Sequence, residues 1–388
     1  MSFQAADMSE QAFQLYERLG WVYGAVRRVS LDVSGLPWKL FAGKGKQENP
    51  LESGAMFDLL EEPNSLQTFR QLMQATISYL ETVGAAYLLF FPPPLPALWP
   101  LRPDRVQPLL SPSAQLLGWE YRGVNGVVVL PPEAIVPFTY FSPREPIGGH
   151  MSPLMPVNLS AQGMIAAMAW NVTFFERGAS PSGVLESDLE VDETAYDRVK
   201  ADVADNWSGL DGAHGIPVLT HGFKWKSIEA AHKDMGYEGL LRLSREEVLG
   251  SIGVPPAIVG DYKNANYAQV EAQLKSYWEF KLKPIIQSIE ETLTRFVSRM
   301  VQDGVRFTYD LSGVKILQED LTAKAQREQI QIANGTRTRK ELREADGLPS
   351  YPGAEEPLIA TSLVPYRTKA ELDEQAALRA RSRRSRPA

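Results

Sequence analysis

The four histidines are the first side chains to test for catalysis, because imidazole is both a common general base and a common metal ligand. They are His150, His214, His221 and His232. No two of them lie four residues apart, which is the spacing that places two histidines on one helix face around a zinc ion. We therefore expect loop or helix-end roles for all four, and no metal site.

The serine, lysine and acidic motifs also lack the spacing that catalysis requires. Residues 178–183 read GASPSG, which is not the G-x-S-x-G pattern of a nucleophile elbow. The Gly-Lys-Gly-Lys run at 43–46 lacks the spacing of a nucleotide-binding loop. The acidic pairs at 246–247 and 290–291 are chain neighbours on predicted helices, so their carboxylates point to different sides. We expect solvated helix faces there, no cofactor and no enzyme.

Composition narrows the class further. The chain has 388 residues and 44% apolar content, which is enough for two or three domains. It has no cysteine, so disulfides, thiolate catalysis and zinc–sulfur sites are excluded, and a reducing cytoplasm fits. A net charge of −7 argues against tight wrapping of DNA, although it allows DNA to slide past. The first twenty residues are acidic and amphipathic, so we expect no signal peptide.

Residues 157–175 carry no charge and form the one candidate for a membrane-spanning helix. The stretch also holds polar side chains, among them Asn158, Gln162 and Asn171. A membrane span of this length would be more uniformly apolar. We therefore expect a buried helix of a soluble protein and no membrane partner.

The element that organises the chain runs from residue 233 to residue 301. Its first helix ends at Gly253, because the two prolines at 255–256 prevent the helix from continuing. The apolar stripe of that helix consists of Tyr237, Leu241, Val248 and Ile252. A longer helix begins near Asn266, and Pro284 predicts a kink in it because proline removes one helical hydrogen bond.

The N-terminal part predicts alternating helices and strands. We expect a helix at 11–29, a short strand at 38–41 and a buried strand at 85–91. Between them, a helix capped by Asn64 or Ser65 ends at Gly84. Its expected apolar side consists of Leu66, Phe69, Leu72, Met73, Ile77 and Leu80.

Further strands are predicted at 118–121, 126–130, 135–141 and 305–309. The prolines that alternate with hydrophobic residues at 97–109 are typical of an extended connection at a sheet edge.

Residues 187–227 form a small separate unit. Asp192 can cap a helix whose Tyr196, Val199, Val203 and Trp207 repeat at helical spacing. The segments at 216–219 and 223–227 are expected to form a hairpin. So short a unit buries only a small core, so we expect it to depend on neighbouring subunits.

The C-terminal part predicts a helix at 321–333 and a short helix capped by Thr338 together with Glu341. The basic Ser/Arg-rich tail at 379–386 is expected to be disordered.

Several segments, in this order, resemble the portal proteins of tailed double-stranded DNA bacteriophages of the siphovirus type. They are ALWPLRPDRVQPL from residue 97, GHMSPL from 149, FFERGASPSGVL from 174, SREEVLGSIGVPP from 244 and GTRTRKELREADGLP from 335. The chain departs from the family pattern at 155–157, where Met-Pro-Val shifts the start of the next helix toward Asn158.

The resemblance implies an α+β, mainly helical portal fold with wing, stem, clip, tunnel loop and crown, assembled as a ring. The parts would be an N-terminal wing (1–156), a first stem helix (157–180), a strand-helix-strand-strand clip (181–231), a second stem helix (232–253), a tunnel loop (254–267), a long kinked helix with the wing return (268–318), and a crown region with the basic tail (319–388).

The same resemblance implies function and partners. The chain would form a homo-oligomeric ring of about twelve subunits at one capsid vertex, through which double-stranded DNA is packaged and ejected. The clip would dock the terminase, which is the packaging ATPase, and later the head–tail connector, and the ring would contact the major capsid protein. The protein would be found in the virion, and in the host cytoplasm during assembly.

Three sets of residues are candidates for these contacts. For the DNA channel they are Asp261, Tyr262, Lys263, Asn264 and Asn266. For the subunit interface they are Met164, Met168, Trp170, Phe174 and Phe175. For partner docking on the clip they are Tyr196, Arg198, Lys200, Asp202 and Trp207. A turn-forming role for the two asparagines is an equal alternative.

Two other classes stay open at this stage. The first is a non-viral structural or adaptor protein that binds partner helices with its helical hairpin. The second is a hydrolase whose catalytic residues converge from distant loops. A ring would be on the order of half a megadalton, whereas the alternatives are more often monomers or dimers.

Overall fold

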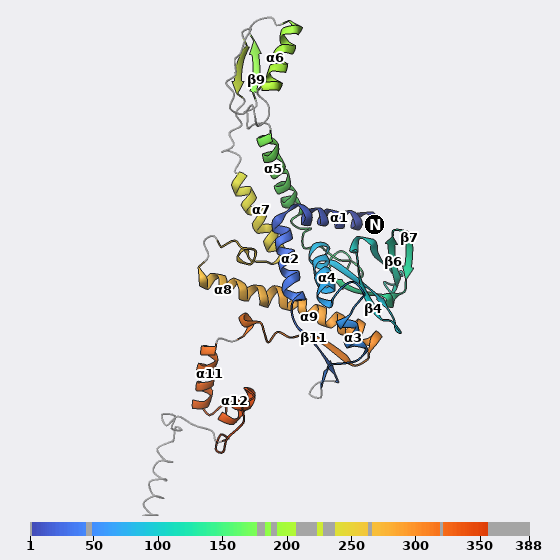
Figure 1. Ribbon diagram of the computed structural model, residues 1–388, viewed down its shortest axis with the longest axis vertical. Helices are drawn as coiled ribbons and strands as arrows, with labels where there is room; N and C mark the ends of the chain where they lie inside the picture. The colour runs from blue at the N-terminus through green and yellow to red at the C-terminus, as the bar shows by residue number, and fades with distance from the viewer. Residues whose placement is uncertain are drawn as a thin grey trace, which may run out of the picture. The chain divides into compact units, whose positions relative to one another are not determined.

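The computed structural model describes residues 2–43, 49–176, 183–187, 192–206, 223–227, 237–262, 266–318 and 321–355 (Figure 1). The chain divides into two units, residues 1–317 and 318–388, which are described in turn. Helices and antiparallel sheets are mixed, with helices predominating, so the α+β, mainly helical class is confirmed.

The first unit begins with two helices, α1 (Ser2–Arg18) and α2 (Gly20–Ser34), instead of the single helix expected at 11–29. They meet at Leu19, whose backbone is extended and whose side chain is buried. Glycine at position 20 is a poor helix former, so interrupting the helix there costs little free energy, and the burial of Leu19 stabilises the interrupted conformation. A short helix, α3 (Ala55–Glu61), follows.

Helix α4 (Phe69–Val83) packs against α2 and starts later than predicted. Its cap is Thr68, which forms a capping box with Gln71, whereas Asn64 accepts the backbone N–H groups of Leu66 and Gln67 in a preceding turn. Leu66 is therefore exposed, and its assignment to the apolar side was wrong. The predicted end at Gly84 is confirmed.

One antiparallel sheet joins distant parts of the chain in the order β11-β1-β2, built from β1 (Trp38–Ala42), β2 (Asn49–Leu51) and β11 (Val305–Tyr309). Leu40 of β1 pairs with Phe307 of β11. Glu290 accepts hydrogen bonds from the Tyr309 N–H and the Thr308 hydroxyl, both at 2.7 Å. The expectation of a solvated face was therefore wrong for Glu290, because its carboxylate fastens a helix to this sheet.

Two further antiparallel sheets follow: the first contributes Leu88 and Phe138 to the main core, and the second packs against the first through a separate cluster that includes Val106 and Trp119. One has the order β4-β3-β8, from β3 (Ala85–Phe91), β4 (Ala97–Leu101) and β8 (Ile135–Thr139). The other has the order β5-β6-β7, from β5 (Val106–Leu110), β6 (Leu116–Gly123) and β7 (Gly126–Leu130). The 3-10 turns η2 (Pro103–Arg105) and η3 (Pro132–Ala134) connect them.

The hairpin expected to be the stem consists of α5 (Asn158–Glu176) and α7 (Tyr237–Ile252), and the predicted start of α5 at Asn158 is confirmed. Between them lie β9 (Gly183–Ser187), α6 (Glu193–Asn206) and β10 (Phe223–Ser227). Strands β9 and β10 pair antiparallel, and Asp192 accepts the Ala195 N–H at the start of α6. The predicted strand at 216–219 lies outside the described residues.

The long helix is assembled from α8 (Tyr267–Ser276), η6 (Tyr277–Leu282), α9 (Lys283–Thr292), η7 (Leu293–Ser298) and α10 (Arg299–Val301). Both η6 and η7 are π-helical turns. Pro284 lies two residues after the end of η6, so the predicted irregularity takes the form of a widened turn, which accommodates the hydrogen bond that proline cannot donate. A 3-10 turn, η8 (Lys315–Leu317), closes the first unit.

The second unit contains the predicted helices α11 (Leu321–Ala333) and α12 (Arg339–Ala345). Thr338 and Glu341 form the expected capping box. The guanidinium groups of Arg339 and Arg343 lie 5.6 and 5.4 Å from the ring centre of Tyr351, which holds the following loop on α12. The basic tail lies outside the described residues.

Candidate channel loop and subunit interface

Helices α5 and α7 pack side by side and rest on the main core at one end of the hairpin. Met164 of α5 and Val248 of α7 are both buried there. The Ser160 hydroxyl donates to the Glu247 carboxylate across the pair. The Ser251 hydroxyl donates to the Pro153 carbonyl, which ties α7 to the segment that leads into α5. These bonds fix where the loop after α7 begins.

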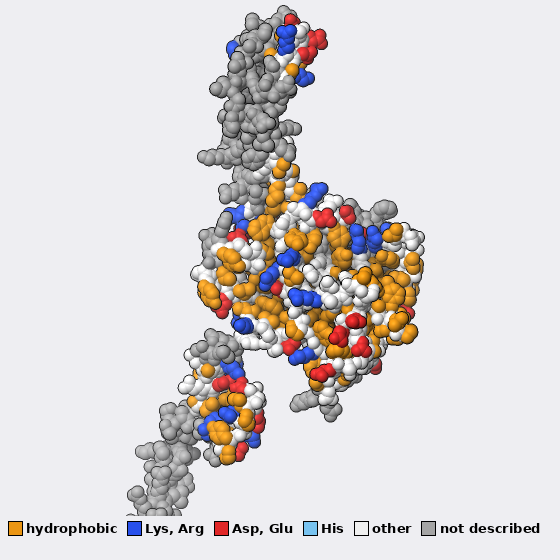
Figure 2. Space-filling view, viewed as in Figure 1, with side chains coloured by type: hydrophobic (Ala, Val, Ile, Leu, Met, Phe, Trp, Pro, Cys, Tyr) orange, Lys and Arg blue, Asp and Glu red, His pale blue; other side chains and the backbone are white. Residues whose placement is uncertain are grey.

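Further along α5, apolar side chains face away from the chain's own core (Figure 2). Met168 is 42% exposed and Trp170 is 45% exposed. Met164, by contrast, is only 2% exposed and offers no surface to another subunit. The side chains of Phe174 and Phe175 lie outside the described part of the chain. Of the five predicted interface residues, Met168 and Trp170 are the two that the structure shows to be exposed.

The loop after α7 is a set of tight turns packed on the core. Gly253 has φ of +80°, and the N–H groups of Gly253 and Val254 both bond to the Leu249 carbonyl, closing the helix end. Val254 and Ala257 are buried, and a 3-10 turn, η5 (Pro256–Val259), follows. This half of the loop is therefore built to hold one shape.

An ion pair anchors the next part of the loop. Asp261 lies 2.7 Å from Arg245 of α7, and the Asp261 side chain is only 10% exposed. The Arg245 guanidinium also lies over the Trp21 ring, 5.1 Å from its centre. The charge of Asp261 is thus partnered within the chain, and its role seen here is to hold the loop. Arg245 belongs to the SREEV motif of the sequence, from which no role had been inferred.

The exit from the loop is set by a capping box. Asn266 accepts the Gln269 N–H at 2.9 Å, and the Gln269 side chain accepts the Asn266 N–H at 3.0 Å. For Asn266 the turn-forming alternative is therefore the role that the structure shows. Tyr262 and Tyr267 on either side are exposed, and Lys263 and Asn264 lie outside the described residues.

A buried ion pair braces the start of the loop. Glu81 of α4, whose side chain is fully buried, lies 2.7 Å from Lys281 of the long helix and also accepts the Tyr140 hydroxyl. A Cβ placed on Gly253 would lie 3.2 Å from Lys281, so the lysine stem packs directly against the end of α7. Burial, together with the Glu81 charge, raises the pKa of Tyr140. The hydroxyl therefore stays protonated and able to donate.

On the predicted clip, Tyr196, Arg198 and Lys200 of α6 are exposed. The Asp202 side chain and the whole of Trp207 lie outside the described residues. Tyr196 and Lys200 share one side of α6, whereas Arg198 lies on the opposite side, and the acidic Glu193 and Asp197 are exposed as well.

Other kinds of site were searched for in the described residues. They contain no group of three His, Asp or Glu side chains placed to hold a metal ion. None of the described helices is long and apolar enough to cross a lipid bilayer.

Comparison with known proteins identifies the family. The model of the phage portal protein family matches residues 21–347. This chain belongs to the phage portal protein family. Portal proteins are structural components, and this chain is a portal protein.

Individual relatives agree with this assignment. The chain is 23% identical to an uncharacterized protein of Rickettsia bellii over 84% of this chain and 86% of that one. It is 24% identical to the probable portal protein of Streptomyces phage phiC31, over 55% of this chain and 49% of the phage protein. Its fold matches the neck of a native gene transfer agent particle, computed with C12 symmetry, with a TM-score of 0.60 and 22% identity over 86% of this chain and 91% of that chain.

Proposed function

We propose that this portal protein forms the ring at one capsid vertex through which double-stranded DNA is packaged and ejected. The observation that carries the proposal is helix α5, which has no charged residue before Glu176 and whose Met168 and Trp170 stay exposed in a single chain. Apolar surface of this kind is stabilised when another subunit covers it. The C12 symmetry of the matching neck structure supports twelve subunits.

We assign the parts of the ring from the hairpin outward. Helices α5 and α7 form the stem, residues 181–231 between them form the clip, and residues 254–267 form the tunnel loop. Residues 1–156 and 268–318 form the wing, and residues 319–388 form the crown region. A ring of this kind needs a heterologous interface, in which two different faces of each subunit meet.

DNA must be held in the channel without sticking to it. The net charge of −7 favours weak contact with phosphates, because tight binding requires many Lys and Arg contacts. The first half of the loop is anchored, and we assign Tyr262, Lys263 and Asn264, which follow it in the chain, to the contact with DNA. Movement of the DNA would come from a separate packaging ATPase, the terminase, docked on the clip around the exposed side chains Tyr196, Arg198 and Lys200.

In the mature particle the same part of the clip would bind the head–tail connector, and the wing would contact the major capsid protein. The protein would then reside at the portal vertex of a virion or of a virion-like particle, and in the host cytoplasm during assembly. The match to a particle neck supports this location.

Electron microscopy of the purified protein, together with its mass, tests the ring. Twelve chains of 43.2 kDa amount to about 518 kDa. The Trp170→Asp variant should yield monomers or aggregates, because a charge would be buried at the interface. Phe141→Asp, at an exposed aromatic side chain outside the hairpin, is the matched control and should leave rings intact. Intact rings from Trp170→Asp would remove α5 from the interface.

A second experiment tests the tunnel loop separately. Replacing residues 262–265 by two glycines keeps the Asp261 anchor and the Asn266 cap. Rings should still assemble, while packaging or DNA retention should fall. Normal packaging by this variant would show that the loop is not the gate.

A further inference from the structure

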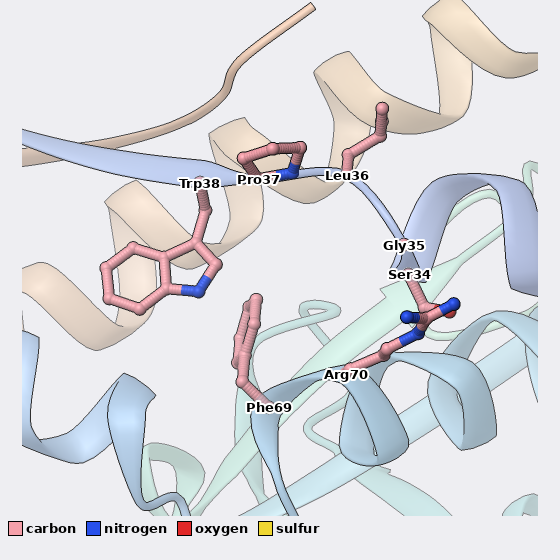
Figure 3. A pocket seen from close by; sticks show the side chains of 7 residues that line it. All are labelled: Ser34, Gly35, Leu36, Pro37, Trp38, Phe69 and Arg70. Atoms are coloured by element: carbon pink, nitrogen blue, oxygen red, sulfur yellow. The ribbon is translucent and has the colours of Figure 1, made fainter. Parts of the chain in front are cut away.

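A shallow hollow of about 390 Å³ lies where the α2–β1 connection meets the start of α4. Ser34, Gly35 and Arg70 line one side of it, and Trp38 and Phe69 line the other (Figure 3). Leu36 and Pro37 complete its edge. One hollow thus presents a polar, cationic end and an aromatic end.

The polar end has unused hydrogen-bonding capacity. Arg70 is exposed and forms no ion pair or hydrogen bond with any described residue. The Ser34 hydroxyl is buried and has no hydrogen-bond partner among the described residues, which is costly unless a ligand supplies one. Arg70 also belongs to the first turn of α4, which contains no acidic residue, so the helix dipole favours an anion there. These features together are suited to a carboxylate.

The aromatic end is suited to a ring. Phe69 is buried in the wall and Trp38 packs against it, with ring centres 5.8 Å apart. A further aromatic side chain can add an edge-to-face contact to such a pair. The hollow would therefore bind an aromatic side chain adjacent to a carboxylate.

The chain itself exposes that combination at the π-helical turn η6. Phe280 is 77% exposed and has no ring contact within the described structure. Its neighbour Glu279 is exposed and, among the described residues, forms no ion pair or hydrogen bond. Consecutive side chains on a helix diverge, so the pair can reach the two ends of one hollow.

We infer that Glu279 and Phe280 of one subunit insert into the Ser34–Arg70 hollow of the next. This inference rests on the proposed ring, whose closure requires two different surfaces on every copy. The Glu279 carboxylate would accept hydrogen bonds from Arg70 and from the Ser34 hydroxyl, and Phe280 would cover Phe69 and Trp38. Repeated around the ring, the contact would satisfy a buried hydroxyl and bury an exposed aromatic side chain in every subunit.

Charge reversal of the full-length protein tests the contact. Arg70→Glu and Glu279→Arg should each raise the concentration needed for half-maximal assembly by on the order of thirtyfold, since each removes one partner of a buried charged pair. The double variant, with the charges exchanged, should return to within about threefold of the parent. Arg144→Glu and Glu291→Arg are the matched controls at other exposed sites, and both should assemble like the parent. Mass photometry measures assembly, and thermal melting checks that each chain is folded.

Cross-linking provides an independent measurement. The chain has no cysteine, so any cross-link between thiols comes from introduced residues alone. Arg70→Cys with Glu279→Cys should give a ladder of covalent oligomers with a bis-maleimide whose spacer matches the reach of an arginine–glutamate pair, which is too long for a direct disulfide, whereas Arg144→Cys with Glu279→Cys should not.

The two levels of the proposal fail differently. Single charge reversals that assemble like the parent, a double variant that is not restored, or no ladder from the Arg70→Cys/Glu279→Cys pair would each overturn this contact while leaving the ring in place. A parent protein that forms no rings would overturn the proposed function and the contact with it.

Discussion

Replacing Lys281 by methionine should destabilise the chain strongly. Methionine keeps the unbranched stem that packs against Gly253 but removes the ammonium group that lies 2.7 Å from Glu81. The Glu81 side chain is fully buried, so its carboxylate would retain only the Tyr140 hydroxyl as a hydrogen-bond partner. Removing one partner of a buried pair in this way costs about 3–5 kcal/mol.

Lys281 itself is 16% exposed by its side chain, so water relieves part of that cost. We therefore expect a loss of about 3 kcal/mol in the free energy of unfolding, at the low end of the range. The double variant Glu81→Gln/Lys281→Met removes both charges and should recover more than half of the loss, because no unpaired charge stays buried.

Denaturant unfolding followed by tryptophan fluorescence measures this. All variants should carry Trp170→Asp, so that subunit association does not add to the apparent stability. A Lys281→Met protein within 1 kcal/mol of its parent, or a double variant less stable than the single one, would refute the claim that this pair braces the long helix against α4.

Three further predictions concern a backbone position, the loop anchor and pH. Gly84→Ala should lower the free energy of unfolding by about 3 kcal/mol or more, since Gly84 has φ of +84° and an added Cβ would overlap the Met151 carbonyl. Gly304→Ala is the control, because Gly304 has φ of +73° but lies in open space, and it should lower the free energy of unfolding by only about 1 kcal/mol in the same denaturant assay. Asp261→Asn should spare ring assembly but speed proteolysis of the loop about tenfold, and unchanged cleavage would argue against the anchor. Burial lowers the pKa of His150 despite the opposing effect of a nearby carboxylate. The neutral imidazole therefore makes its full contribution to stability above about pH 6.5, and that contribution is lost as the pH falls. His150→Gln should flatten the decline of the free energy of unfolding between about pH 7 and 5, and an unchanged pH profile would argue against this role.

Element ends were predictable where one residue decides them locally. Gly253 and Gly84 end helices in the left-handed conformation, and Thr338 and Asn266 start helices as capping residues. Each signal acts over three or four residues, so the sequence around it contains the whole cause. The boundaries of the candidate tunnel loop follow from two of these positions.

Where several local signals compete, sequence alone does not choose between them. Asn64, Ser65 and Thr68 can each cap a helix, and only the structure shows that Asn64 closes a separate turn while Thr68 caps α4. The break at Leu19 is similar, because helical spacing continues through it and tertiary burial decides the outcome.

The charged partners of the candidate site could not be predicted, because an ion pair between distant segments leaves no periodic pattern. Arg245 and Asp261 are 16 residues apart across a turn, and Glu81 and Lys281 are 200 apart. The position of the loop was therefore predictable, whereas the contacts that hold it were not. Asp261 illustrates the result, because a carboxylate expected at the DNA channel is an internal anchor.

Helix α5 shows most directly why a chain's own fold does not account for all of its sequence. The apolar side chains of a helix are stabilised only where another element covers them. In the first half of α5 only the side that holds Ala161 and Met164 is covered within the chain, and Leu159 is 83% exposed. Beyond Met164 the helix does not meet this condition, since Trp170 and Val172 are exposed and residues 165–175 carry no charge to make solvation favourable. The absence of charge in residues 165–175 is explained if another subunit covers them, so the composition of α5 reflects the ring as much as the monomer.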